Sequence, residues 1–407
     1  MSATSLALSN LRAIVILIVL GFHSMLAYLD WLPARQRPFD QPPYEWQSFA
    51  IVDSQRFIGF DLFCAWHDIY LMALMFLISG LFVWPSLERK GSLAFLRDRL
   101  LRLGLPLVLA VYVLMPVALY PSYHVTAAAP SVSEYMRQFM ALPFWPCGPQ
   151  WFLWQLLALN ILSAGLYRVA PDTGSLFKRL ADWAAAYPGR FAAAMLLASA
   201  LAYIPVALIV SPWTWFHFGP IHFQQCRPLL YTLFFAAGMA LGARGLDSGI
   251  LSADGPLAHR WRLLAALAVT GFIVWIAPMA VLMQNPGEAG PMWLQVAAAI
   301  GFVLSCATGA ALVLGLALRF SRRRRPLLDS LSANAYGMYL VHYIFVVWMQ
   351  FALLGLAVPA LVKFAAVFGV TVLLSWVATL AFGKLPLGAK VVRTHRQQGE
   401  TGSPRAS

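Results

Sequence analysis

The first residues that could carry chemistry lie in an apolar segment near the N-terminus, where Arg12 and His23 are 11 residues apart. In an α-helix this spacing is three turns plus about 20° and a rise of about 16.5 Å, so both side chains share one face. Ionisable groups in a membrane helix are costly, which makes each a functional candidate. An imidazole is suited to acid–base work near neutral pH. The alternative is a helix-end anchor, Arg12, and a histidine packed in the core.

A second group lies in the segment LSANAYGMYLVHYIFVVW, where Tyr336, Tyr339 and His342 recur at intervals of three. This spacing predicts that they share one side of a helix. If that helix begins near residue 330, His342 lies about 18 Å along it, at nearly the depth of His23. The two imidazoles therefore predict a shared polar cavity. The alternative for His342 is a hydrogen bond that only joins two helices.

Arg99 and Arg102 form a third group in the segment FLRDRLLRLGLPL. Guanidinium groups at a helix start can bind phosphates bidentately, although most such clusters are arginines that only set membrane topology. Farther out, FDLFCAWHDIYL contains Asp61 and the neighbours His67 and Asp68. Adjacent helical residues point about 100° apart, which favours an interfacial role over acid–base catalysis.

Two loops, PFWPCGPQWFLW and SPWTWFHFGPIHFQQ, combine Trp, Phe, His and Gln. This composition is typical of an interfacial aromatic belt and also of a sugar-binding surface. Cys147 and Cys226 fall in these loops, and whether they form a disulfide stays open. The four cysteines have no metal-ligand spacing, and the sequence contains no HExxH, GxSxG or Gly-rich phosphate loop. No metal site is predicted.

The composition shows which elements must position these residues. The chain has 407 residues, of which 60% are hydrophobic and 11% charged, with a mean hydropathy of +0.70. A soluble domain carries about 25% charged residues, so a soluble enzyme and a disordered chain are both excluded. Ten segments have the length and apolarity of membrane spans: 11–29, 62–84, 101–120, 150–169, 191–210, 226–243, 262–283, 292–318, 330–350 and 358–382.

The net charge of +13 would suggest nucleic-acid binding in a soluble protein. Here the cations gather in alternate loops, as the positive-inside rule predicts, and no nucleic-acid partner is expected. If the N-terminus is inside, only six of the 29 Lys and Arg residues lie outside: Arg35, Arg37, Arg56, Arg137, Arg227 and Lys363. We therefore predict an all-α polytopic membrane protein with about ten transmembrane helices and both termini cytoplasmic. Residues 1–389 would form one transmembrane domain, and 390–407 a disordered cytoplasmic tail.

Taken in order, these residues resemble the integral-membrane acyltransferase 3 family, over about residues 6–385. The resemblance rests on the Arg-x10-His of Arg12 and His23, the Arg-x-x-Arg of Arg99 and Arg102, and the run YGMYLVH that ends at His342. FLISGLFV around Ser79–Gly80 and WFL at Trp151–Leu153 are similar to further family segments. The glucan-modifying, succinyltransferase C-like branch is the most similar. The long loop from Asp53 to His67 departs from it and leaves the acceptor open.

The resemblance implies transfer of an acyl group, acetyl or succinyl, from cytoplasmic acyl-CoA to a hydroxyl of an extracytoplasmic glycan or lipid-linked sugar. The site would lie in a bacterial cytoplasmic (inner) membrane, in contact with membrane lipid. Acyl-CoA would be a donor substrate, with no cofactor permanently bound.

In that reading the roles divide among the three groups. Three arginines would hold the nucleotide end of the donor, and His23 would be the general base. Three residues of the ninth span would orient the acceptor or polarise the thioester oxygen. An acyl-histidine intermediate stays open. The arginines are Arg12, Arg99 and Arg102, and the residues of the ninth span are Tyr336, Tyr339 and His342.

Two other functions fit the same composition. A lipid-sugar flippase or small-molecule carrier would use similar loops without consuming a thioester, although such carriers usually need buried carboxylates, which are scarce here. A membrane sensor or scaffold would tolerate neutral residues at positions 12 and 23. Release of free CoA in proportion to modified acceptor distinguishes an acyltransferase from both.

Overall fold

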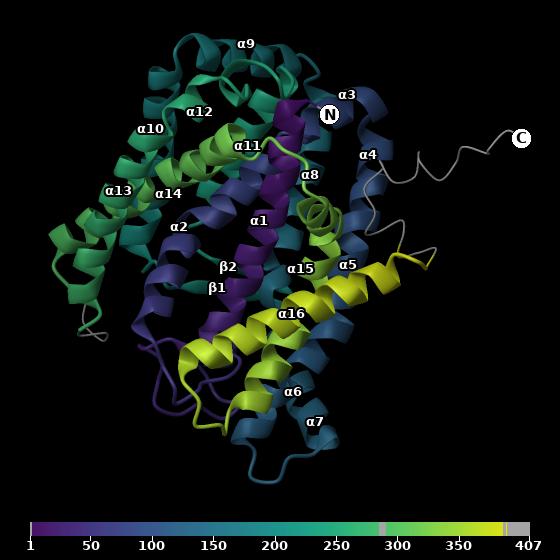
Figure 1. The fold of residues 1–407 in the computed structure, drawn as a ribbon, viewed down its shortest axis with the longest axis vertical. Helices are drawn as coiled ribbons and strands as arrows, with labels where there is room; N and C mark the ends of the chain where they lie inside the picture. Colours follow the sequence, from purple (N-terminus) through teal and green to yellow (C-terminus); the bar gives the residue numbers. More distant parts are fainter. Residues whose placement is uncertain (1, 285–289, 386–387, 389–407) are drawn as a thin grey trace, which may run out of the picture.

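The protein, seen here as a computed structural model, is a bundle of helices with one small β-hairpin (Figure 1). The structure describes residues 2–284, 290–385 and 388. Nine helical segments in these residues are long and apolar enough to cross a membrane: Ala3–Tyr28, Ile58–Lys90, Ser92–Thr126, Gly148–Val169, Pro188–Ile209, Trp261–Leu282, Met292–Phe320, Pro326–Leu353 and Ala360–Phe382. The predicted all-α polytopic membrane fold is confirmed.

The chain forms sixteen α-helices in the described residues. The helices are α1 (Ala3–Met25), α2 (Ile58–Gly80), α3 (Val83–Lys90), α4 (Ser92–Arg99), α5 (Leu105–Leu109), α6 (Met115–Thr126), α7 (Val132–Ala141), α8 (Trp151–Val169), α9 (Thr173–Ala186), α10 (Pro188–Ile209), α11 (Pro228–Ala243), α12 (Pro256–His259), α13 (Trp261–Leu282), α14 (Met292–Phe320), α15 (Pro326–Leu353) and α16 (Ala360–Phe382). Two π-helical segments, η3 (Leu100–Gly104) and η4 (Ala110–Leu114), interrupt the long helix that runs from α4 to α6. Strands β1 (Trp215–Phe218) and β2 (Ile221–Gln224) pair antiparallel, with His217 opposite His222.

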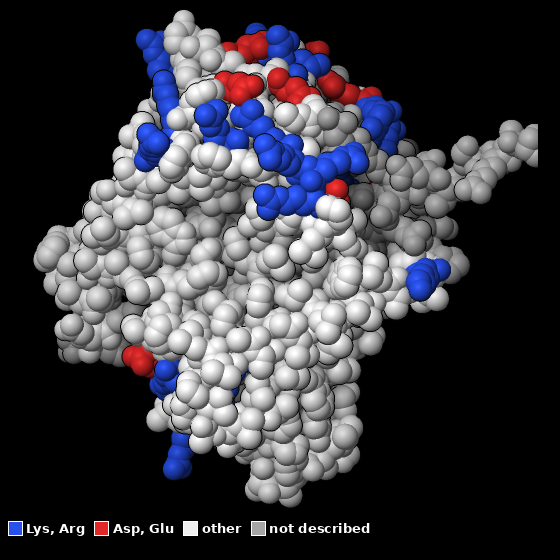
Figure 2. Space-filling view, viewed as in Figure 1, with Lys and Arg blue, Asp and Glu red and all other residues white. Residues whose placement is uncertain are grey.

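The two ends of the bundle differ in charge. Figure 2 shows Lys and Arg gathered at the end where Figure 1 places the N-terminus, α3 and α9. We call this the basic end, and the end with α6, α7 and residues 30–57 the loop end. The positive-inside rule predicts that the basic end faces the cytoplasm. The predicted tail, residues 390–407, lies outside the described residues.

The sixth predicted span, 226–243, forms a helix two residues shorter than expected. It forms α11, a buried helix of 16 residues, about 24 Å long by the helical rise, against a hydrocarbon thickness of about 30 Å. The hairpin β1–β2 directly precedes α11 and ends at Gln224, outside the predicted span (Figure 1). Hydropathy alone does not separate such a helix from a full span.

Helices α2 and α11 touch backbone to backbone through three glycines. A Cβ added to Gly238 would lie 2.1 Å from the Leu77 carbonyl oxygen, and one on Gly80 would lie 2.2 Å from the Phe235 carbonyl oxygen. One on Gly242 would lie 2.0 Å from the carbonyl oxygen of Leu81. Small residues permit such close approach between membrane helices. This contact holds the second half of α11 against the C-terminal end of α2.

Proline shapes the long helix Ser92–Thr126 and ties it to α15. Pro121 has no N–H, so the carbonyl of Val117, four residues earlier, loses its helical donor. The indole Nε1 of Trp348 on α15 donates to that carbonyl at 2.9 Å. The carbonyl that Pro121 leaves unpaired therefore receives its hydrogen bond from a side chain of the neighbouring helix.

The loop between α1 and α2, residues 30–57, closes the loop end over a buried ion pair. Lys363 of α16 places its Nζ 2.6 Å from Oδ2 of Asp53, and both residues are only 1% exposed. Arg56 donates to the carbonyls of Leu32 and Pro33. Because a buried ion needs its partner, this pair holds the loop to α16.

We expect Gly238→Ala to lower the thermal midpoint of the detergent-solubilised protein. The new methyl meets the Leu77 carbonyl, and overpacking of this kind costs about 1–3 kcal/mol. Gly165→Ala is the matched control, because a Cβ at this α8 position meets nothing within 4 Å; it should leave the midpoint unchanged or raise it. Equal midpoints for both variants would contradict the α2–α11 contact.

Candidate functional site

The histidines of α1 and α15 meet inside the bundle. The ring centroids of His23 and His342 are 4.9 Å apart, and Nε2 of His342 lies 3.3 Å from Nδ1 of His23. His342 is fully buried and His23 is half-buried. The sequence predicts a shared polar cavity at matched depth, and the structure places the two imidazoles in direct contact.

Backbone carbonyls fix the tautomers of both rings. Nδ1 of His23 lies 2.8 Å from the Val19 carbonyl, and Nδ1 of His342 lies 2.7 Å from the Tyr339 carbonyl. A carbonyl oxygen only accepts, so both Nδ1 atoms carry the proton in neutral rings. Nε2 of His342 then accepts from Nδ1–H of His23. Nε2 of His23 is left with a free lone pair and no hydrogen-bond partner in the described part of the chain, which is what a general base requires.

Gln350, which the sequence analysis missed, fixes the backbone at this point. Its Nε2 donates to the carbonyl of His23 at 3.0 Å and to that of Ser24 at 3.3 Å. The residue is 2% exposed and lies two turns beyond His342 on α15. An uncharged amide in an apolar helix gives a weak sequence signal, yet here it sets the register between α1 and α15.

The two tyrosines of α15 are anchors. The hydroxyl of Tyr339 donates to the carbonyl of Pro149, and that of Tyr336 donates to the carbonyl of Arg102. Pro106 explains the second bond, because it lacks the N–H that a helix would direct at Arg102. Each phenol oxygen can still accept a hydrogen bond, so a role in binding substrate stays a prediction.

Gln150 is a second residue that the sequence analysis missed. It lies in the short turn before α8, is fully buried, and donates through Nε2 to the carbonyl of Leu340 at 3.0 Å. Its Oε1 is buried and has no partner among the described residues. An unsatisfied buried acceptor is costly. The turn that holds Pro149 and Gln150 therefore presents a free oxygen close to the part of α15 that carries His342.

The predicted donor-binding arginines contact aromatic rings. The guanidinium of Arg12 lies 5.0 Å from the ring centre of Phe82, and that of Arg99 lies 4.8 Å from that of Phe95. Among the described residues neither guanidinium forms an ion pair or a hydrogen bond. The N–H groups of both remain available to an anion. Arg102 is linked to the histidine pair through its carbonyl, Tyr336 and α15.

The neighbours His67 and Asp68 do not act together. Nδ1 of His67 donates to the carbonyl of Phe63, whereas the carboxylate of Asp68 binds Arg227. The two neighbours therefore make separate contacts, as their different directions on the helix predict.

The open question of a disulfide has a clear answer: Cys147 and Cys226 are both free and buried. Burial raises the pKa of the Cys147 thiol, so at neutral pH it is no thiolate nucleophile. Among the described residues no group of three or more His, Cys, Asp or Glu side chains could hold a metal.

Comparison with known families agrees with this geometry. The Acyl_transf_3 model, described as an acyltransferase domain, matches residues 5–380, which include both histidines and all three arginines. The chain belongs to the acyltransferase 3 family. It is therefore a multi-pass membrane acyltransferase. Comparison with curated proteins and with solved structures gave no match.

We expect Tyr336→Phe to destabilise this acyltransferase by about 1–3 kcal/mol, because the Arg102 carbonyl loses its donor. Pro106→Ala restores a backbone N–H at that position. In the Tyr336→Phe background this substitution should therefore lower stability less than in the wild type, or raise it. Thermal unfolding of the two single variants and the double variant measures this coupling. Tyr112→Phe, at a residue 53% exposed, is the control. Additive effects would show that the Arg102 carbonyl does not need Tyr336.

Proposed function

We propose that this enzyme moves an acetyl or succinyl group from cytoplasmic acyl-CoA to a hydroxyl of an extracytoplasmic glycan or lipid-linked sugar, in the inner membrane of a bacterium. The observation that carries the proposal is the free Nε2 lone pair of His23, whose Nδ1–H is directed at Val19 and His342. A base with a fixed tautomer inside a membrane acyltransferase suits the deprotonation of a hydroxyl.

The donor would enter from the basic end. Arg12 and Arg99 have guanidinium groups without carboxylate partners in the described residues, which suits the phosphates of CoA. His23 lies on the same face of α1 as Arg12, about 16.5 Å farther along. The extended pantetheine arm would carry the thioester along this face to the histidine pair.

In the proposed transfer, His23 is the only group that needs to take up and release a proton. Nε2 takes the proton of the acceptor hydroxyl as its oxygen attacks the thioester carbonyl. The C–S bond then breaks, and the proton passes from Nε2 to the CoA thiolate, which gives an ester and free CoA thiol. While His23 is protonated, its Nδ1–H still faces the Val19 carbonyl and Nε2 of His342, and both acceptors stabilise the imidazolium.

The free Oε1 of Gln150 supports an acceptor position beside this pair. It could accept a hydrogen bond from a second hydroxyl of the incoming sugar. The predicted roles of Tyr336, Tyr339 and His342 in orienting the acceptor belong to the same proposal. The second candidate, a lipid-sugar flippase or carrier, is favoured by no contact at the site, and the family assignment favours an enzyme.

We expect His23→Gln to lower CoA release at least 100-fold, since general-base catalysis contributes about 10²–10⁴ in rate. The assay offers acetyl-CoA and succinyl-CoA to the solubilised protein with a cell-envelope glycan extract. His259→Gln, at an exposed histidine of the basic end, should keep the full rate. A folded His23→Gln protein with normal release would exclude His23 as the base. A folded wild type that modifies glycan without releasing CoA would exclude the acyl-CoA donor.

We expect the double variant Arg99→Gln, Arg102→Gln to raise the KM for acyl-CoA at least tenfold with a smaller change in kcat, because charge-assisted contacts to phosphate are lost. Arg190→Gln, at an exposed arginine of the same end, is the control. An unchanged donor KM in the folded double variant would remove these arginines from the donor site.

A further inference from the structure

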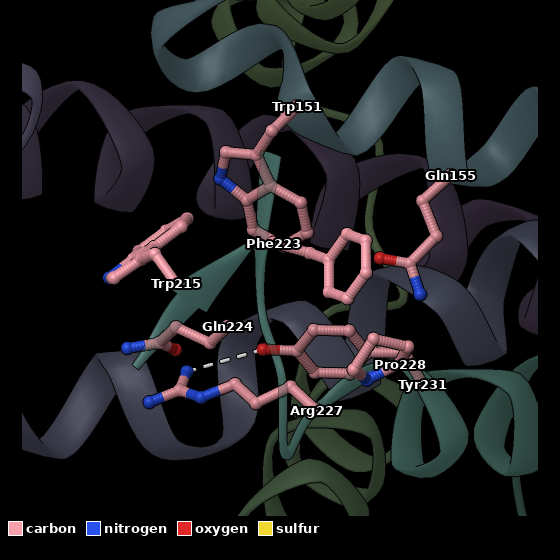
Figure 3. Close-up of a pocket in the computed structure, with 8 residues that line it drawn as sticks. All are labelled: Trp151, Gln155, Trp215, Phe223, Gln224, Arg227, Pro228 and Tyr231. Atoms are coloured by element: carbon pink, nitrogen blue, oxygen red, sulfur yellow. Dashed lines mark hydrogen bonds between the residues drawn. The ribbon is translucent and has the colours of Figure 1, made fainter. Parts of the chain in front are cut away.

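A pocket separate from the histidine pair lies between the hairpin and the starts of α8 and α11. Trp151 and Gln155 come from α8, Trp215 and Gln224 from the two strands, and Arg227 and Tyr231 from the start of α11 (Figure 3). The space among these side chains, which opens to solvent, is about 210 Å³. We call it the hairpin pocket.

Two polar atoms in the hairpin pocket are buried and unsatisfied. Gln155 is 4% exposed and its Oε1 accepts no hydrogen bond, while Arg227 is 6% exposed and its Nε–H donates none, among the residues that the structure describes. Each such group costs about 1–3 kcal/mol when left without a partner. A ligand with hydroxyl groups supplies both a donor and an acceptor.

The positive charge of Arg227 in the pocket is neutralised by a carboxylate of the protein itself. The Nη1 and Nη2 atoms of Arg227 bind the Asp68 carboxylate, with an Nη2–Oδ2 distance of 2.5 Å, and Nη1 also contacts the Tyr231 hydroxyl at 3.2 Å. A carboxylate or phosphate in the pocket would compete with Asp68 for the same guanidinium and lie near its negative charge. This favours a neutral occupant over an anionic one.

Aromatic faces complete the lining. Trp151 stacks against Tyr231 with ring centroids 6.0 Å apart, and Trp215 is still 36% exposed. Figure 3 shows the two indoles above Arg227 and Tyr231. Flat apolar surfaces beside a few convergent polar groups are what a small polar ring with apolar C–H faces requires.

The hairpin is fixed in place before any ligand binds. Nε2–H of His222 donates to the Trp145 carbonyl at 2.7 Å, and the indole of Trp154 donates to the His222 carbonyl at 3.2 Å. Burial lowers the pKa of His222 to about 4, so its ring is neutral at neutral pH. A preorganised wall reduces the entropy lost on binding.

The hairpin pocket is linked to the histidine helix α15 through the turn before α8. Trp151, which lines it, follows Gln150 directly, and Gln150 binds α15 at Leu340. Asp68 lies ten residues from the loop-end start of α2, a depth of about 15 Å. The pocket is therefore sunk into the bundle from the side that the acceptor would enter.

We propose that the hairpin pocket is an acceptor subsite that holds one uncharged sugar ring of the glycan, so that a neighbouring ring presents its hydroxyl to His23. This inference rests on the proposed function for its place in the reaction. It assigns recognition to Trp215 and Gln155, and it selects neutral sugar units over uronic acids at this position.

Binding is measured first, in the His23→Gln protein, so that no acyl transfer is needed. Saturation-transfer NMR would use neutral glucose oligomers, neutral oligosaccharides from the envelope extract, and glucuronic acid. We expect signals from neutral sugars that fall at least tenfold in Trp215→Ala and Gln155→Leu. Trp213→Ala, at an exposed residue outside the pocket lining, should bind normally. No Trp215-dependent signal from any neutral sugar, or preferential binding of glucuronic acid, would overturn the subsite.

Kinetics with intact His23 separate the subsite from the proposed function. Gln155→Leu and Trp215→Ala should raise the KM for glycan at least tenfold and leave the KM for acyl-CoA unchanged. Folded variants with an unchanged glycan KM would overturn the subsite, while acyl transfer itself would stand. If wild type releases no CoA but the binding pattern holds, the proposed function fails and the sugar site stands.

Discussion

The contact between His23 and His342 is the constraint on which the site depends. Two imidazoles in an apolar bundle must each find a partner, and here each Nδ1 is directed at a carbonyl of its own helix. Among the described residues only one ring nitrogen of the pair then remains free, and it belongs to His23. This result needs α1 and α15 in one register, which the amide of Gln350 secures by binding the α1 backbone at His23 itself. In the proposed reaction a slip of one residue between these helices would remove the base from its partner.

Proline extends this constraint to the arginine-bearing helix. Pro106 and Pro121 each leave a carbonyl without its helical donor, and α15 supplies the missing donors through Tyr336 and Trp348. Irregular backbone in a membrane is tolerated where neighbouring side chains satisfy it. The π-helical segment that contains Arg102 is consequently joined to the histidine helix by a hydrogen bond that a regular helix would not offer. The arginine motif and the histidine pair are thus parts of one connected framework.

The features that could be predicted from the sequence are those set by helical geometry. The shared face of Tyr336, Tyr339 and His342, and the matched depth of His342 and His23, follow from a constant rise and rotation per residue. The bounds of α11 follow the predicted span 226–243 closely. The hairpin before it could not be predicted, because its aromatic residues also suit an interfacial loop. Gln150, Gln155 and Gln350 carry no charge and recur at no period, so nothing in one sequence marks them. The pairing of Asp68 with Arg227 depends on the α2–α11 contact, which only the folded chain supplies.

Arginine has two different environments in this protein, and the difference bears on which ligands each end can take. Arg12 and Arg99 lie over aromatic rings without a carboxylate partner in the described residues, so their charge is available to an anion. Arg227 is neutralised by Asp68 and keeps only a single Nε–H for a ligand. In the proposed reaction, an anionic donor and a neutral acceptor would then be sorted by charge before either reaches the histidines. Asp68 cannot leave Arg227 to make room for an anionic ligand at low cost, because an uncompensated charge in the bundle carries a large desolvation penalty. Sorting by charge thus follows from the same ion pair that fixes the start of α11.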